Sequence, residues 1–280
     1  MSGVSDLLSG ERLAVQLSEL GVRRGGVLLV HASMRSVGAV DGGVRTMVDA
    51  LRLAVGPEGT LVVPSITPEN SDTSPAYRRS VHGLTDEARE AVCAAMPPFD
   101  RATTPAPSVG RLAEAVRLTP GAERSGHPQT SFAALGPAAR TLTTGHSPDC
   151  HYGEASPLAR LYECDARILL LGTGFDTCTA FHLAEYRVTR PPRRRYRCVV
   201  TARGLRRWWE YEDVDLDDSD FAALGRDFER ADTTGAVRAG PVGAAHSRLV
   251  RLTAAVDFAA GWLEEHRVAR PADPAEAIRP

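Results

Sequence analysis

The chain has 280 residues, of which 43% are hydrophobic and 24% are charged, as in an ordinary globular protein of one large or two small domains. Its net charge of −2 argues against nucleic acid as a partner. No apolar run is long enough to span a membrane, and the N-terminal residues lack the basic and apolar regions of a signal peptide. We therefore expect a cytoplasmic protein without a nucleic-acid or membrane partner.

The cysteine and arginine content adds two expectations. The five cysteines are odd in number and scattered, which indicates reduced thiols rather than a disulfide framework. The chain contains no lysine, so its 33 basic residues are all arginine. This bias is typical of a high-GC bacterial genome.

The first third of the chain predicts a β-α-β unit. In chain order, the apolar pattern indicates a helix over 5–20, a strand over 27–30, a helix after Asp41 and a strand over 60–64. We expect Gly21 to end the first helix. The polar loop 31–38 can offer backbone N–H groups and hydroxyls to a phosphate or an amide. It has neither the lysine of a nucleotide loop nor a Gly-x-Gly-x-x-Gly motif.

The middle of the chain has fewer regular segments. Residues 73–108 contain several prolines and little periodicity, so we expect a long functional loop around a helix at 85–95. The pattern then indicates a helix over 109–117, a turn at His127-Pro128 before a strand, and a helix that begins at Pro157.

A short apolar strand, Ala166 to Leu171, leads through a Gly-x-Gly turn into a helix that carries His182 and Glu185. Residues three apart on a helix share one face, so these two side chains can touch. A carboxylate beside an imidazole fixes its tautomer and raises its basicity, as a general base near neutral pH requires. The spacing also fits a surface ion pair. A zinc site would need a third ligand, and the chain has no His-x-x-x-His or Cys-x-x-Cys spacing, so we expect no metal.

The last third mixes charged runs with apolar segments. In chain order, we expect an extended solvated loop at Arg190 to Arg195, a strand over 198–201, a turn at 240–245 and a last helix over about 245–265. The acidic stretch 210–220 ends in Asp217 to Asp220, which we expect to cap a helix that begins near Phe221. We interpret the chain as one domain over residues 1–267, with an inserted loop region at about 68–108 and a loose tail at 268–280.

Four ordered motifs resemble one protein family. They are His31-Ala32-Ser33-Met34-Arg35-Ser36-Val37-Gly38, Arg124-Ser125-Gly126-His127-Pro128 with Ser131 and Ala133, Ser156 to Leu161, and the segment from Leu169 to Tyr186. In this order and spacing, the set is similar to the aminoglycoside 3-N-acetyltransferases of the antibiotic N-acetyltransferase family, over about residues 10 to 265. Each motif alone is weak, but the ordered set is specific.

The resemblance implies an α/β fold with a central mixed sheet flanked by helices, distinct from the GNAT acetyltransferase fold. It implies acetyl-CoA as the co-substrate that donates the acetyl group and a primary amine as the acceptor, most simply the 3-amino group of an aminoglycoside. A homodimer is a candidate assembly.

The resemblance also assigns roles to residues. It implies that His182 is the general base, that Glu185 orients it and that Asp176 lies by the acceptor amine. It implies that the coenzyme is held by His31, Ser33, Met34, Arg35, Ser36, Val37, Gly38 and Ser131. The carboxylates that could meet a polycationic sugar include Asp72, Asp100, Asp176 and Glu212, and most of them fit solubility or helix capping equally well.

The chemistry of such a transfer is consistent with these residues. An aliphatic amine is mostly protonated at pH 7 and must lose a proton before it attacks a thioester. An imidazole held by a carboxylate can accept that proton, and the tetrahedral oxyanion then needs donors, for which the Thr179 hydroxyl is a candidate. The resemblance implies direct attack in a ternary complex, so Cys178 is not required as a nucleophile.

Three other interpretations stay open. The same chemistry can tailor an amine intermediate in natural-product biosynthesis, and an anionic intermediate would need a basic pocket, for example from Arg190 to Arg195. A non-catalytic coenzyme-binding protein would not need His182 together with Glu185. A hydrolase is the third alternative, but the chain has no Gly-x-Ser-x-Gly elbow.

Overall fold

The strands at the centre of the sheet are the apolar segments that the sequence predicts. In the computed structural model, which describes residues 7–267, β1 (Val27–Ala32) pairs in parallel with both β2 (Thr60–Pro64) and β5 (Arg167–Leu171). Strands that are covered on both faces read as continuous apolar runs. The β-α-β unit predicted for the first third is confirmed.

The described residues form a seven-stranded sheet in the order β3-β4-β2-β1-β5-β9-β8. β4 pairs antiparallel with β2, and β9 pairs antiparallel with β5, so the sheet is mixed, as predicted. The other strands are β3 (Glu123–Arg124), β4 (Phe132–Leu135), β6 (Arg193–Ala202), β7 (Leu205–Val214), β8 (Val237–Val242) and β9 (Ala245–Arg251).

Most of the predicted helices begin and end close to the expected positions, but the first and the last begin later than expected. The α-helices are α1 (Gly10–Leu20), α2 (Met34–Val37), α3 (Gly43–Val55), α4 (Pro75–Ser80), α5 (Asp86–Ala95), α6 (Arg111–Arg117), α7 (Ala139–Thr143), α8 (Pro157–Glu163), α9 (Phe181–Arg187), α10 (Phe221–Ala231) and α11 (Leu252–His266). Short 3-10 turns are η1 (Pro68–Asn70), η2 (Pro107–Val109) and η3 (Phe175–Thr177). Gly21 ends α1 in the left-handed conformation, as expected.

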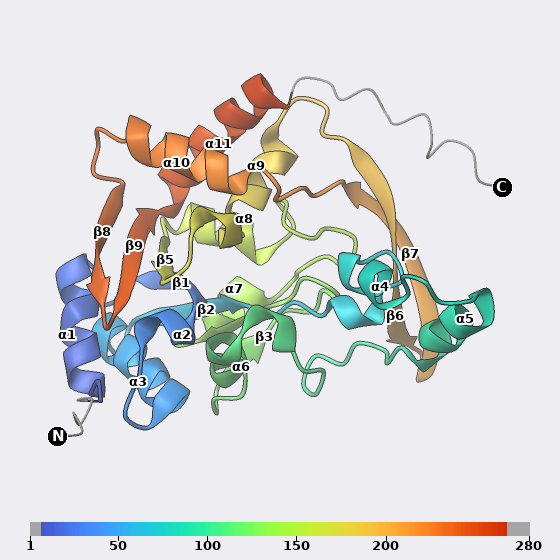
Figure 1. Cartoon of the computed structure of the whole chain (residues 1–280), viewed down its shortest axis with the longest axis horizontal. Coiled ribbons are helices and arrows are strands. Elements are labelled where there is room, and N and C mark those ends of the chain that lie inside the picture. Colours follow the sequence, from blue (N-terminus) through green and yellow to red (C-terminus); the bar gives the residue numbers. More distant parts are fainter. Residues whose placement is uncertain (1–6, 268–280) are drawn as a thin grey trace.

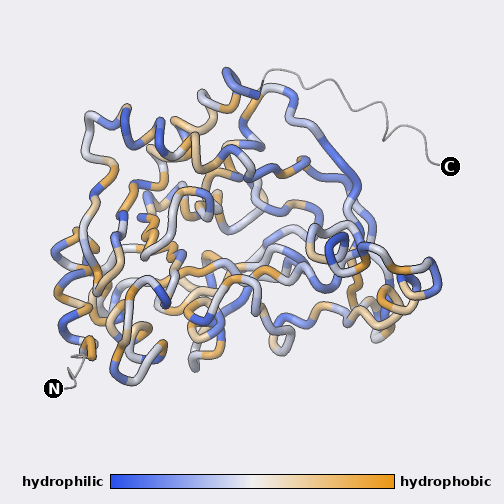
Figure 2. The backbone as a smooth tube through the Cα atoms, in the orientation of Figure 1, coloured by the Kyte–Doolittle hydropathy of each residue, from blue (hydrophilic) through white to orange (hydrophobic). Residues whose placement is uncertain are grey.

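Helices cover both faces of the sheet (Figure 1). One apolar cluster joins α1, α3 and α6 to Leu28 and Val30 of β1, and a second joins α7 to α11 to Leu29 of the same strand. Successive side chains of a strand point to opposite faces, so β1 contributes to both cores. Figure 2 shows the hydrophobic residues concentrated in these central elements.

β6 and β7 form a separate hairpin at the end of the molecule away from β8 and β9 (Figure 1). The excursion 73–108 packs along it. The Phe99 N–H donates to the Val199 carbonyl at 3.1 Å, and Arg206 Nε donates to the Met96 carbonyl at 3.1 Å. The helix expected at 85–95 is present as α5, at the far end of this excursion (Figure 1).

Two expectations for the last third are wrong. Arg193 to Arg195 do not lie in a loop but begin β6, where Arg193 pairs with Glu212 at 3.0 Å. Residues 245–251 form β9 instead of the start of the last helix. Their apolar spacing fits either a helix or a strand. They form a strand because they pair with β5 in the sheet, where Leu249 lies opposite Leu169.

Two further predictions concern segments that include residues outside 7–267. The first helix was expected from residue 5 but begins at Gly10, after the Ser9 side chain accepts the Arg12 N–H. The tail at 268–280 lies outside the described residues, as do residues 1–6. No helix within residues 7–267 is long and apolar enough to cross a membrane.

Candidate active site

The loops that follow β1 and β5 lie side by side because the two strands are parallel neighbours. Ala32 pairs with Leu171, and the Ser33 N–H donates to the Leu171 carbonyl at 2.9 Å. The chain then turns at Gly172, where φ is +66° and a Cβ would lie 2.6 Å from Ser36 Cβ. Only glycine allows the two loops to approach so closely. The carboxyl ends of such strands are where α/β proteins place their sites.

A cavity of about 530 Å³ lies at these strand ends, a volume typical of small-molecule sites. Both loops line it, together with the start of α6, the residue Tyr152 and the beginnings of α9 and α10. The residues around it that bear functional groups include His31, Ser33, Asp176, Thr179, His182 and Asp218.

The His182 and Glu185 side chains meet at the wall of this cavity. Nδ1 of His182 lies 2.5 Å from Oε2 of Glu185 on α9. The Glu185 side chain is 3% exposed and the His182 side chain 13%. A carboxylate only accepts hydrogen bonds, so we assign the hydrogen to Nδ1, which leaves the Nε2 lone pair free.

Two further donors hold Glu185. The Asp217 N–H donates to Oε1 at 2.9 Å, and the Arg267 guanidinium donates to the same oxygen. Arg267 Nε also donates to Asp220 at 2.7 Å. Burial lowers the pKa of Arg267, but Asp220 and Glu185 outweigh it and raise the pKa above its usual value. The buried carboxylate therefore faces a permanent positive charge.

The capping role expected for Asp217 to Asp220 is only partly met. Asp220 is the N-cap residue of α10, but its side chain makes no capping hydrogen bond and binds Arg267 instead. No spacing in the sequence connects Arg267 to Glu185, because 82 residues separate them. Sequence reasoning missed this arginine for that reason.

Two aromatic rings pack against the His182 imidazole. The Tyr152 ring stacks on it with centroids 4.8 Å apart and an interplanar angle of 5°. The Phe221 ring lies 4.8 Å away at 56°. Both residues also line the cavity. Tyr152 follows α7 in a segment without regular structure, and sequence reasoning did not select it.

Two polar atoms at the cavity have no partner among the described residues. They are Nε2 of His31 and Oγ1 of Thr173, and both are buried. Burial, and after it the charge of His182, lowers the pKa of His31 to about 4, so this imidazole is neutral at pH 7. A buried polar atom without a partner is a place where a bound ligand can supply one.

A profile of the aminoglycoside 3-N-acetyltransferase family matches residues 29–264. The chain belongs to this family. It is 39% identical over 270 residues to aminoglycoside N(3)-acetyltransferase VII of Streptomyces paromomycinus, which covers 91% of each protein.

Solved structures of similar proteins share the fold. The YokD protein of Bacillus subtilis has a TM-score of 0.87 and 32% identity, over 95% of this chain and 97% of that chain. The structure described as AAC-IIIb binary with CoASH has a TM-score of 0.80 and 33% identity, over 96% of this chain and 100% of that chain. The α/β fold of the antibiotic N-acetyltransferase type is confirmed, and the chain is an acyltransferase.

In this acetyltransferase, the residues that the resemblance assigned to the coenzyme divide into two groups. His31 and Ser33 line the cavity, and Met34 to Gly38 continue from them as α2 and its C-terminal cap. Ser131 is not among the described residues that line the cavity. It is fully buried, donates to the Ser65 carbonyl at 2.7 Å and accepts from Arg124 Nε at 2.9 Å. The structure places Ser131 in the framework of the sheet edge.

Of the four carboxylates expected near the acceptor, one lines the cavity and three do not. Asp176 lines the cavity. The other three bind elsewhere. Asp72 pairs with Arg197, and Glu212 pairs with Arg193. Asp100 accepts hydrogen bonds from the backbone of its own turn. Asp218, an exposed residue from the same acidic stretch as Glu212, lines the cavity in their place.

Thr179 and Cys178 precede α9 and both line the cavity. Thr179 is 8% exposed, and its carbonyl accepts the His182 N–H at 3.1 Å. Burial raises the pKa of Cys178 to about 12, so its thiol is protonated at pH 7 and is a poor nucleophile. No group of three or more His, Cys, Asp or Glu residues within residues 7–267 is arranged to hold a metal ion.

Proposed function

We propose that this enzyme transfers an acetyl group from acetyl-CoA to the 3-amino group of an aminoglycoside. The observation that carries the proposal is the buried His182–Glu185 pair on the wall of a cavity shared with the loop after β1. The names of the relatives support both substrates, since one acts on aminoglycosides and another was solved with CoASH.

The loop after β1 has the groups that a coenzyme arm requires. The hydroxyls of Ser33 and Ser36 lie 2.8 Å apart, and Arg35 beside them is exposed. Hydroxyls and backbone N–H groups can bind the amides of the pantetheine arm, and a guanidinium can bind the phosphates of coenzyme A. With the arm in this position, the thioester would enter the cavity beside His31 and His182.

The acceptor amine reacts only after it loses a proton, and Nε2 of His182 is the atom we assign to accept it. The amine then attacks the thioester carbonyl directly, and the C–N bond forms before the C–S bond breaks. Coenzyme A leaves as a thiolate that takes up the second proton of the attacking nitrogen to become the thiol, and His182 returns its proton to water. Glu185, which is itself bound by Arg267, holds the imidazole while it carries the extra proton. The Thr179 hydroxyl is the candidate donor to the oxyanion.

The charges around the cavity favour a cationic acceptor. Asp176 and Asp218 line it, and both are exposed carboxylates. Among Arg190 to Arg195, which an anionic acceptor would use, Arg193 pairs with Glu212 and none lines the cavity. This distribution supports an aminoglycoside over an anionic biosynthetic intermediate.

The test is the release of coenzyme A thiol from acetyl-CoA with a panel of aminoglycosides, simple amines and no amine. We expect turnover with aminoglycosides that carry a 3-amino group and none with analogues that lack it, and NMR of the product should place the acetyl group on that nitrogen. His182→Ala should lower kcat about 100- to 10,000-fold. Turnover only with small or anionic amines would contradict the proposed acceptor, and thiol release without any amine would indicate a hydrolase.

A further inference from the structure

Tyr152 lines the cavity and is in contact with the proposed base. Its ring lies flat on His182, at 4.8 Å and 5°, and its side chain is almost completely buried. Glu185 fixes only one edge of the imidazole, through Nδ1. A ring held at one edge can still rock about that hydrogen bond, and a flat aromatic neighbour limits that motion.

The position of Tyr152 depends on a neighbouring tyrosine of α9. The Tyr152 N–H donates to the Tyr186 hydroxyl at 3.3 Å. The next residue, Gly153, lies so close to the Tyr186 ring that a Cβ there would be 2.3 Å from it. Phe132 packs edge-on against the Tyr152 ring at 5.9 Å. The backbone and the ring of Tyr152 are therefore both constrained.

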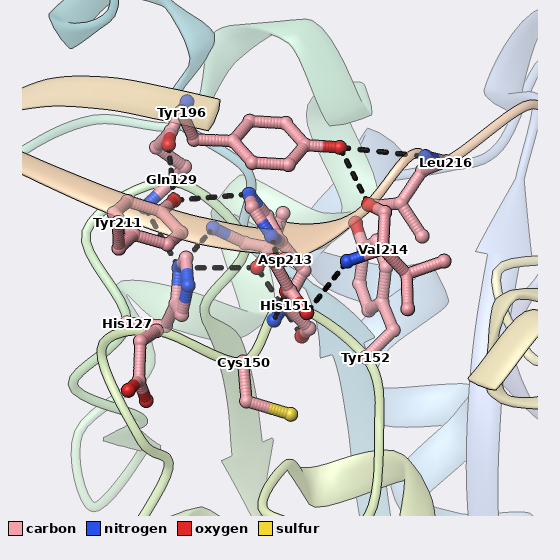
Figure 3. Close-up of polar contacts among 12 residues, drawn as sticks. His127, Gln129, Cys150, His151, Tyr152, Tyr196, Tyr211, Asp213, Val214 and Leu216 are labelled. Atoms are coloured by element: carbon pink, nitrogen blue, oxygen red, sulfur yellow. Dashed lines mark hydrogen bonds and ion pairs between the residues drawn. The ribbon is translucent and has the colours of Figure 1, made fainter. Parts of the chain in front are cut away.

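Asp213 of β7 bonds both to His151, the residue before Tyr152, and to Tyr186. Figure 3 shows Asp213 beside His151. Oδ2 of Asp213 accepts three hydrogen bonds, from the His151 N–H at 2.7 Å, from His151 Nδ1 at 2.8 Å and from the Tyr186 hydroxyl at 2.5 Å. Its Oδ1 accepts the Val214 N–H at 2.8 Å. Burial raises the pKa of Asp213, but the hydrogen bonds from His151 and Tyr186 outweigh it and lower the pKa below its usual value.

We propose that Tyr152 and Asp213 are positioning residues for the general base. Asp213 holds His151 and Tyr186, these two hold Tyr152, and Tyr152 keeps the His182 ring in the plane in which Nε2 meets the acceptor amine. The proposal rests on the proposed function, because it concerns the same proton transfer. The β6–β7 hairpin supplies Asp213 and so helps to position the general base.

The stacked ring also suits the charge that the reaction creates. His182 becomes an imidazolium when it accepts the proton of the amine. A cation over the face of a tyrosine is stabilised by the ring quadrupole, and a phenylalanine face does the same. The role therefore belongs to the aromatic ring and not to the hydroxyl, and this separates it from acid–base chemistry by Tyr152 itself.

The test compares Tyr152→Phe, which keeps the ring, with Tyr152→Leu, which removes the ring but keeps an apolar side chain. We expect Tyr152→Phe to retain kcat within about 3-fold, and Tyr152→Leu to lose about 10- to 100-fold in kcat with KM for acetyl-CoA changed by less than about 3-fold. Tyr162→Leu is the control for loss of a tyrosine ring, because Tyr162 is half-buried, bonds Asp257 and does not line the cavity. It should leave kcat unchanged.

Asp213→Asn supplies a second variant of nearly the same size. We expect the folded protein to lose about 3- to 30-fold in kcat with little change in either KM, since the base is displaced but both binding sites remain. If Tyr152→Leu does not fold, this variant decides the question. A merely structural role would lower the melting temperature and the folded yield but leave kcat per folded molecule unchanged.

The outcomes that overturn the proposal are separate from those that overturn the proposed function. Unchanged kcat in folded Tyr152→Leu or in Asp213→Asn would exclude positioning, as would an equal loss in Tyr152→Phe and Tyr152→Leu. In each case wild type would still acetylate the aminoglycoside and His182→Ala would not. Failure of the wild type to acetylate any amine would instead remove the proposed function.

Discussion

At the residue scale, the decisive contact is between Glu185 and Arg267. The carboxylate is 3% exposed and also bonds His182, so its position determines that of the imidazole. The guanidinium supplies a charge that does not titrate near neutral pH and joins α9 to the end of α11. A buried charge that loses its partner is costly, so this pair is a sensitive point of the site.

Replacement of Arg267 by glutamine tests this contact. We expect Arg267→Gln to lower the free energy of unfolding by about 3 kcal/mol, because Glu185 keeps its burial and loses its partner, and to lower kcat at least about 10-fold through displacement of His182. Urea unfolding and steady-state kinetics are the measurements. Arg230→Gln is the control, since Arg230 is 77% exposed in its pair with Asp227 and such pairs contribute less than about 1 kcal/mol. Equal effects of the two variants would contradict the argument.

At the element scale, the site depends on two parallel strands and the loops that leave them. The apolar runs of β1 and β5 could be recognised from the sequence because both faces of these strands are buried. The start of α11 could not be placed, since residues 245–251 have an apolar spacing that fits either period. Pairing with β5, a contact with residues about 80 positions away, made that segment a strand.

The approach of the two loops at Gly172 can be tested by adding one methyl group. We expect Gly172→Ala to destabilise the protein by about 2 to 4 kcal/mol and to raise KM for acetyl-CoA, because φ is +66° and the new Cβ would lie 2.6 Å from Ser36. Gly204→Ala is the matched control, with φ of +74° and nothing within 4 Å, and it should cost only about 1 kcal/mol. A similar KM in both variants would show that the close contact does not shape the coenzyme loop.

At the scale of the whole molecule, the structure buries several histidines as neutral groups. Burial lowers the pKa of His31 and of His146 to about 4, and it lowers the pKa values of His127 and His151 as well. His127 packs against both His146 and His151, with ring centroids 4.9 and 4.7 Å apart. The three belong to segments that meet between the sheet edge and the hairpin. Their protonation therefore affects the assembly of the whole fold.

The expected consequence is a loss of stability in mild acid. The unfolded chain binds protons to His31 and His146 below about pH 6.5, and the folded chain does so only near pH 4, so the stability present at pH 7 falls as the pH is lowered through this window. Between pH 7 and pH 5, His31 and His146 should each account for roughly 2 kcal/mol. Urea unfolding at both pH values measures the loss, and His146→Gln should reduce it. A free energy of unfolding that stays constant or rises on acidification would contradict this account.

The sequence by itself determined the α/β class, the parallel β-α-β unit and the His182–Glu185 contact. These features are local, because strand burial follows from an apolar run and a helix brings residues three apart onto one face. Only the tertiary structure decided that Arg267 holds Glu185, that Tyr152 stacks on His182, and that Asp176 and Asp218 rather than Asp72, Asp100 or Glu212 line the cavity. Each of these contacts joins segments far apart in the chain, and its geometry exists only when the sheet, the hairpin and the C-terminal helix have packed together.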